Sequence, residues 1–187
     1  MSFEPLIEFY ERSHQNWPCI IRVKSASLPE PYHRLLAHNG DMTATLESFH
    51  GRKIHLNVLE HVCTDREMLR KVVLVLEGSE EPVEFGAIRI CLSLFDPEPR
   101  DHILEGRLPL GTILKRYAVD HVSRPQVFFE VLSDGVTNDA LGLSTCEKLY
   151  GRQNLILTPD RKVLAKVVEI LAPSETSGTG SDTTCES

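Results

Sequence analysis

The 187-residue sequence lacks the features that mark several classes of protein. It has no Lys/Arg-rich run, and its net charge of −7 argues against a general nucleic-acid binder, because phosphate contacts need a basic surface. No apolar run approaches the ~18 residues of a transmembrane helix. The N-terminal MSFEPLIEFYERSHQ carries Glu4 and Glu8 within its apolar pattern, so it is neither a signal peptide nor a membrane span.

Cysteine is also scarce. The five cysteines form no CxxC pair and no Cys/His cluster with zinc spacing, so we expect no metal site. Scattered thiols of this kind are typical of reduced cysteines in a cytoplasmic protein. The GxSxG nucleophile signature and the phosphate-binding loops are missing as well, which excludes the commonest sequence-readable catalytic sites.

What the sequence does contain is a change of period near residue 53. Before it, apolar residues recur at helical spacing in three stretches, around 3–12, in PYHRLLAH and in DMTATLESFHG. After it, six segments are rich in β-branched and aromatic residues and are separated by turn residues. These segments are KIHLNVLEHV, EMLRKVVLVLEG, VEFGAIRICLSLF, QVFFEVLSD, KLYGRQNLILTP and KVLAKVVEILAP.

These elements predict an α+β fold. GSEEP and TPDR are short enough for hairpins, and short links imply antiparallel pairing. We expect one domain over residues 1–173, a single six-stranded antiparallel sheet with helices on one side, and a ligand between them. PEPRDHILEG and LPLGTILKRY are expected as two short helices between the third and fourth strands, and TNDALGLST as a loop or an irregular helical turn. The tail, 174–187, lacks apolar residues and is expected to be disordered.

Two charged residues stand in apolar rows. In RKVLAKVVEILAP, the two-residue period of a strand places Glu169 on a face whose other residues are apolar. In MLRKVVLVL, Arg70 occupies the same kind of position. Glu169 is either a salt-bridged or exposed strand residue, or a carboxyl group under an apolar cover that exchanges a proton near neutral pH. Arg70 needs an anion, either Glu169 or a substrate carboxylate, because a lone buried charge costs several kcal/mol, roughly.

Two weaker candidates complete the set. Gly111 follows Pro109-Leu110 at an expected helix start, where free backbone N–H groups can meet an anion. Arg124, in HVSRPQVFFEV, either decorates the entrance of a strand or assists an anionic site.

From about Leu35 to Pro173 the sequence resembles the chorismate pyruvate-lyase family, which makes 4-hydroxybenzoate and pyruvate from chorismate. The resemblance rests on the order and spacing of DMTATLESFHGRKIHLNVL, MLRKVVLVLEGSEEPVEFG, LPLGTILKRY with SRPQVFFEV, and YGRQNLILTPDRKVLAKVVEILAP. It implies helices that form flaps over an enclosed site, and a cofactor-free elimination of pyruvate from chorismate that leaves an aromatic acid.

The resemblance also implies roles for particular residues. Arg70 would hold a substrate carboxylate, and Glu169 would be the active-site glutamate near the ring hydroxyl. Met42 and Leu110 match positions whose backbone N–H groups hold the ligand.

Two other functions remain open. The same fold occurs in ligand-sensing domains of transcription regulators, which bind a small molecule without converting it. We rank this alternative second, because such domains normally follow a winged-helix DNA reader, for which the residues before the first core helix leave no room. The third is an inactive scaffold in which Arg70 and Glu169 neutralise each other. Ala87 departs from the family, whose members often have arginine there, with Arg89 displaced by two.

Overall fold

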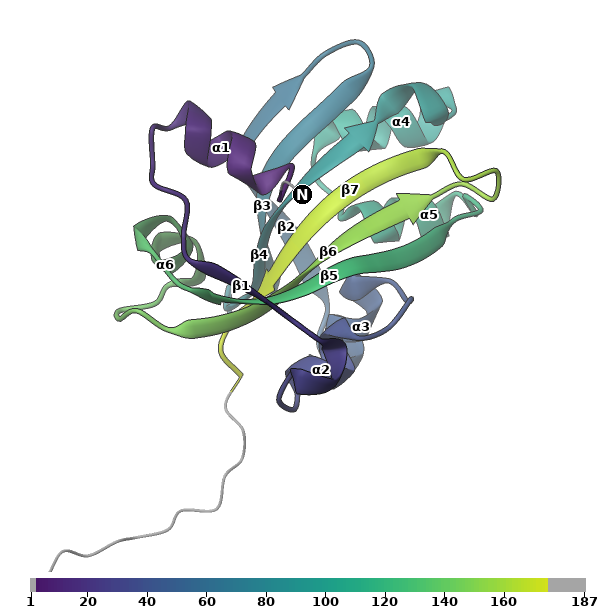
Figure 1. Ribbon diagram of the computed structural model, residues 1–187. Helices are drawn as coiled ribbons and strands as arrows, with labels where there is room; N and C mark the ends of the chain where they lie inside the picture. The colour runs from purple at the N-terminus through teal and green to yellow at the C-terminus, as the bar shows by residue number, and fades with distance from the viewer. Residues whose placement is uncertain (1–2, 175–187) are drawn as a thin grey trace, which may run out of the picture.

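The computed structural model describes residues 3–174, and the tail expected to be disordered lies outside these residues from 175 on. One antiparallel sheet forms the centre, with the strand order β1-β5-β6-β7-β4-β3-β2 (Figure 1). The predicted α+β fold with a single antiparallel sheet is therefore confirmed. Within residues 3–174, no helix combines the length and the apolar character needed to cross a membrane.

The six predicted strands are all present, and a seventh joins them at the edge. That seventh strand, β1, has only four residues and pairs with β5, so its sequence carries too few alternations to reveal a period. The strands are β1 (Ile20–Val23), β2 (Ile54–Cys63), β3 (Glu67–Leu76), β4 (Pro82–Cys91), β5 (Val122–Leu132), β6 (Lys148–Leu157) and β7 (Val163–Leu171).

Helices lie on both faces of the sheet rather than on one. α1 and α6 pack on one face, and α2, α3, α4 and α5 on the other (Figure 1). Helix α6 includes the first five residues of TNDALGLST, the segment expected as a loop or irregular helical turn, and its first turn is capped where the Asp134 side chain accepts a hydrogen bond from the Thr137 N–H. The helices are α1 (Leu6–Arg12), α2 (Tyr32–Leu36), α3 (Met42–His50), α4 (Pro97–Glu105), α5 (Leu110–Arg116) and α6 (Gly135–Leu141).

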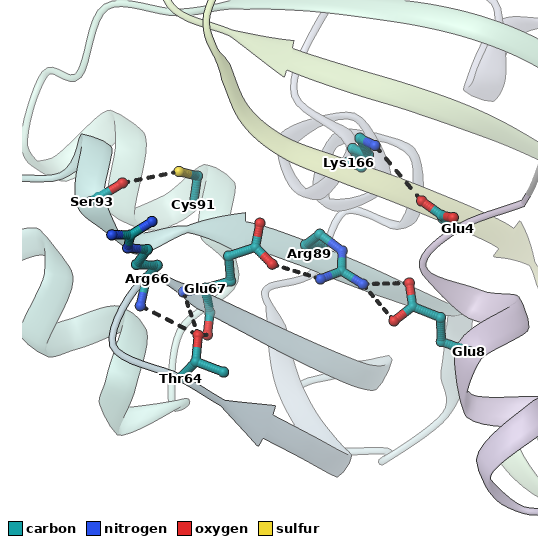
Figure 2. Close-up of polar contacts among 9 residues, drawn as sticks. All are labelled: Glu4, Glu8, Thr64, Arg66, Glu67, Arg89, Cys91, Ser93 and Lys166. Atoms are coloured by element: carbon teal, nitrogen blue, oxygen red, sulfur yellow. Dashed lines mark hydrogen bonds and ion pairs between the residues drawn. The ribbon is translucent and has the colours of Figure 1, made fainter.

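An ion-pair cluster fastens α1 to its face of the sheet (Figure 2). The guanidinium of Arg89, on β4, donates to both carboxylate oxygens of Glu8 on α1 and to Glu67 on β3. Ala87 packs in the apolar core of this same face. The departure from the family at Ala87 and the displaced Arg89 therefore both lie on the face opposite α2–α5.

Candidate ligand-binding site

A cavity of about 80 Å³ lies between the sheet and the first turns of α3 and α5. Its volume exceeds the ~15 Å³ that one water needs on this measure, so it has room for several waters or one small organic molecule. Most of its lining is apolar, as is typical of small-molecule sites. The polar side chains in the lining are Asp41, Thr43, Arg70, Glu84, His121, Ser123, Asn154 and Glu169.

Strand register brings these residues onto one face. Arg70 on β3 pairs with Ile88, Ile88 with Val167, and Val167 with Asn154 on β6, so the four form one row across the sheet. Paired residues of antiparallel strands share a face, and neighbouring strands lie about 4.8 Å apart. The backbones of Arg70 and Asn154 therefore lie roughly 14 Å apart, at the two sides of the cavity floor.

Glu169 forms a buried ion pair, but with Arg152 rather than Arg70. Arg152 stands opposite Glu169 in the β6–β7 register and donates from Nε to the Glu169 carboxylate. Its Nη1 donates to the carbonyl oxygens of Leu36 and His38, each at 2.9 Å, which satisfies free carbonyls at the end of α2. The interpretation in which Arg70 and Glu169 neutralise each other is therefore wrong.

Sequence reasoning missed Arg152, and the structure shows why. Its strand segment, YGRQN, has no apolar row that would make an arginine conspicuous. The register also changes by one residue near the hairpin, where Leu157 pairs with Val163 but Ile156 with Ala165. Without that bulge, Arg152 would face Val168, on the opposite face from Glu169.

Arg70 is buried in the cavity wall without a protein anion. The residue is 1% exposed, and its Nε and Nη1 atoms have no hydrogen-bond partner within residues 3–174. No carboxylate of these residues forms an ion pair with it. Burial lowers the pKa of Arg70 to about 10, which still leaves the guanidinium charged at neutral pH. The predicted burial of Arg70 is thus observed, and no anionic group among the described residues pairs with it.

Like Arg70, Glu84 is a buried charged residue that forms no ion pair among the described residues, and the sequence patterns above did not single it out. It is 5% exposed, lies on β4, and its Oε2 has no hydrogen-bond partner among the described residues. Burial raises its pKa well above the usual range, and the negative charges of Glu169 and Asp41 add to this against the lowering effect of Arg152. The signal was available, because Glu84 shares strand parity with Gly86 and Ile88 in an otherwise apolar run.

The roof of the cavity contains the residues predicted at helix starts. Met42 and Leu110 begin α3 and α5 and line the cavity, while binding by their backbone N–H groups stays a prediction. Gly111 also lines it, but the anion beside Gly111 is the carboxylate of Asp41. A Cβ on Gly111 would lie 2.2 Å from Oδ1 of Asp41, so a larger residue there would displace the Asp41 carboxylate. Asp41 caps α3 by accepting from the Thr43 N–H at 3.0 Å, and burial raises its pKa.

Arg124 lies outside the cavity. Its neighbour Ser123 lines the cavity, so the alternation of strand side chains turns Arg124 away, where it is exposed. Its predicted assistance to an anionic site is not supported by this position. Asn154 lines the cavity together with Ser123. Its Nδ2 donates to Ser123 Oγ at 2.9 Å, and its Oδ1 has no hydrogen-bond partner among the described residues.

No protein-family model and no curated protein sequence matches the chain. Solved structures do share its fold. The effector domain of PhnF from Mycobacterium smegmatis aligns with a TM-score of 0.52 at 11% identity, covering 71% of this chain and 88% of that one. The ligand-binding domain of a regulator assigned to the GntR family, from Bordetella bronchiseptica, aligns with a TM-score of 0.51 at 11% identity, covering 69% and 90%. A longer structure of PhnF aligns with a TM-score of 0.51 at 11% identity. The alignment covers 71% of this chain and 63% of PhnF, so this chain spans less than two thirds of the length of PhnF.

These similarities correct the functional prediction. The Bordetella bronchiseptica structure is named as the ligand-binding domain of a GntR-family transcriptional regulator and the PhnF domain as an effector domain, and neither is named as an enzyme. The prediction of a chorismate pyruvate-lyase is therefore wrong, together with its chorismate substrate and pyruvate elimination. What the resemblance implied about the fold holds, because a chorismate lyase-like sheet is compatible with these domains. The chain has the fold of the ligand-binding domains found in GntR-family regulators.

Proposed function

We propose that this chain is a sensing domain that binds a small organic anion in the cavity and does not convert it. The single observation that carries the proposal is Arg70, a buried guanidinium that lines the cavity and lacks an anion within residues 3–174. A fold shared with structures named as ligand-binding and effector domains supports the same function.

The chemistry of the lining suggests the class of ligand. Arginine binds carboxylates in a planar fork, in which two neighbouring N–H groups of the guanidinium donate parallel hydrogen bonds to one carboxylate. Apolar side chains make up most of the remaining wall, including Leu56, Val72, Ile88 and Leu114. A compact carboxylate with a flat or apolar body, such as an aromatic acid, fits this combination.

The proposal assigns a regulatory rather than a metabolic role. The cavity lies between the sheet and its roof at α3 and α5. A bound ligand would therefore change the contacts between the sheet and these two helices. The net charge of −7 does not favour direct DNA contact by this domain, because phosphate binding needs a basic surface. The cytoplasmic location stays a prediction; the four cysteines among the described residues, Cys19, Cys63, Cys91 and Cys146, are free thiols.

Calorimetric titration with benzoate and 4-hydroxybenzoate tests the proposal, with benzamide and 4-hydroxybenzamide as uncharged matches. We expect the acids to bind and to be recovered unchanged, and the amides to bind at least tenfold more weakly, because only the acids form charge-assisted bonds worth about 1.5–3 kcal/mol. Equal affinity for the acids and the amides, or no binding of any of the four, would contradict an anion site at Arg70.

A further inference from the structure

Glu84 brings a carboxyl group to the cavity that Arg70 lines with its guanidinium. The inference drawn below from Glu84 rests on the proposed function. In the β3–β4 register, Glu84 stands opposite Leu74 and Arg70 opposite Ile88. The two charged residues are thus four positions apart along paired strands, or roughly 13 Å. They line the same cavity, and no ion pair joins their side chains in residues 3–174.

Within residues 3–174, no ion pair or hydrogen bond joins the Glu84 carboxyl group to a cation, although the charge of Arg152 acts on it. Arg152 donates from Nε to Glu169 and from Nη1 to two carbonyl oxygens, while its Nη2 has no hydrogen-bond partner among the described residues. The remaining charged neighbour is Asp41, which is acidic and adds to the repulsion. A buried carboxylate without a cation is costly, so the group takes up a proton and becomes a hydrogen-bond donor.

We propose that Glu84 enters the cavity as a neutral carboxylic acid and donates a hydrogen bond to an oxygen of the bound anion, opposite the end held by Arg70. The ligand class that fits is a monoanion with a carboxylate at one end and a neutral oxygen, such as a hydroxyl or carbonyl, at the other. A neutral Glu84 also removes the repulsion that a second carboxylate would exert on that anion.

The pH dependence follows from the same groups. Burial and the charges of Glu169 and Asp41 raise the pKa of Glu84, with Arg152 acting against them. As the pH rises through this pKa, Glu84 loses its proton, ceases to donate and repels the anion. Ligand affinity should therefore fall on the alkaline side, and this fall should disappear in Glu84→Gln, whose amide donates at every pH.

The experiment combines a ligand-free and a ligand-bound measurement. The infrared spectrum of the unliganded protein at neutral pH is compared between wild type and Glu84→Gln, with Glu81→Gln as a control at an exposed glutamate of the same hairpin. We expect wild type and Glu81→Gln to share the carbonyl stretch of a protonated carboxylic acid, and Glu84→Gln to lack it. Absence of this band from wild type would overturn the inference whether or not any ligand binds.

Titration with 4-hydroxybenzoate supplies the second readout. Glu84→Leu should weaken binding roughly two- to tenfold, the effect of one neutral hydrogen bond, while Glu84→Gln should stay within about twofold of wild type at neutral pH. An unchanged affinity in Glu84→Leu, with wild type binding normally, would overturn the inference and leave the proposed function intact. Failure of wild type to bind any carboxylate would overturn the proposed function, and the infrared band would still report the proton on Glu84.

Discussion

Replacing Arg70 by methionine separates ligand binding from stability. The methionine keeps much of the length of the arginine stem and fills irregular space, but it removes the guanidinium. In the unliganded protein this guanidinium is 1% exposed, and its Nε and Nη1 have no partner among the described residues. The substitution therefore removes an uncompensated charge rather than a structural ion pair.

The magnitude follows from the pKa of Arg70, which burial lowers from the ordinary arginine value to about 10. A change of this size corresponds to about 3 kcal/mol that the charge costs the folded protein. The free energy of unfolding should therefore rise in Arg70→Met, by up to about 3 kcal/mol, because some of the gain is offset by imperfect packing. For a chain of this length, that increase corresponds to a rise in Tm of up to about 10 °C.

Ligand binding should change in the opposite direction. Loss of the charge-assisted hydrogen bonds should weaken binding of 4-hydroxybenzoate by about 1.5–3 kcal/mol, or roughly 10- to 150-fold in Kd. Urea unfolding and calorimetry on the same preparations measure both effects. Arg66→Met is the matched control, because Arg66 is an exposed arginine outside the cavity, and neither quantity should change in it.

Either of two results would refute this reasoning. If Arg70→Met lost several kcal/mol of stability (roughly the cost of breaking a buried ion pair), Arg70 would be bound to a protein group that holds the fold together. A stable variant with unchanged ligand affinity would equally show that the guanidinium does not meet the ligand.

Three further predictions test the surroundings of Arg70. Arg152→Met should lower the free energy of unfolding by about 3–5 kcal/mol in a urea titration, because it leaves Glu169 buried without its partner, and a change below about 1 kcal/mol would contradict the ion pair. Gly111→Ala should lower Tm, with a cost of about 1–3 kcal/mol, because the added Cβ displaces Asp41; the same change should cost clearly less in an Asp41→Ala background. Wild type should lose stability relative to Glu84→Gln as the pH rises, by up to about 1.4 kcal/mol per pH unit. Because the pKa of Glu84 is raised in the folded protein, Glu84 stabilises the fold most below its unfolded pKa near 4.5. This stabilisation is lost as the pH rises through the folded pKa of Glu84. If the free energies of unfolding of wild type and Glu84→Gln, measured in urea, changed in parallel with pH, the prediction would be contradicted.

Much of the fold could be predicted because its signals are local. The change from helical to two-residue period near residue 53 located six strands, and the short GSEEP and TPDR links identified two antiparallel hairpins. The pairing of β4 with β7 carries no such signal, since these strands lie far apart in the sequence. The position of α1 and α6 on the second face likewise depends on packing that a period does not specify.

The site shows the same division between local and long-range information. Arg70 and Glu169 were conspicuous because each interrupts an apolar row of a strand. Arg152, the partner of Glu169, was not conspicuous in the sequence. A bulge near Leu157 shifts the strand register by one residue, and this shift turns Arg152 to the cavity face. Glu84 interrupts an apolar row in the same way, so a search of every predicted strand for charged residues in apolar rows would have found it.

The function was the least accessible part, since the residues that resemble a lyase site are also those that suit an anion sensor. A buried arginine binds a carboxylate whether or not the carboxylate reacts, so the sequence features did not distinguish catalysis from binding.

The central claim is that Arg70 receives the acid group of a bound ligand, and a crystal structure with 4-hydroxybenzoate tests it most directly. We predict that the two carboxylate oxygens each lie about 2.7–2.9 Å from one of two neighbouring guanidinium nitrogens of Arg70, inside the cavity. A ligand bound elsewhere, or an Arg70 side chain turned to a carboxylate of the protein itself, would contradict it.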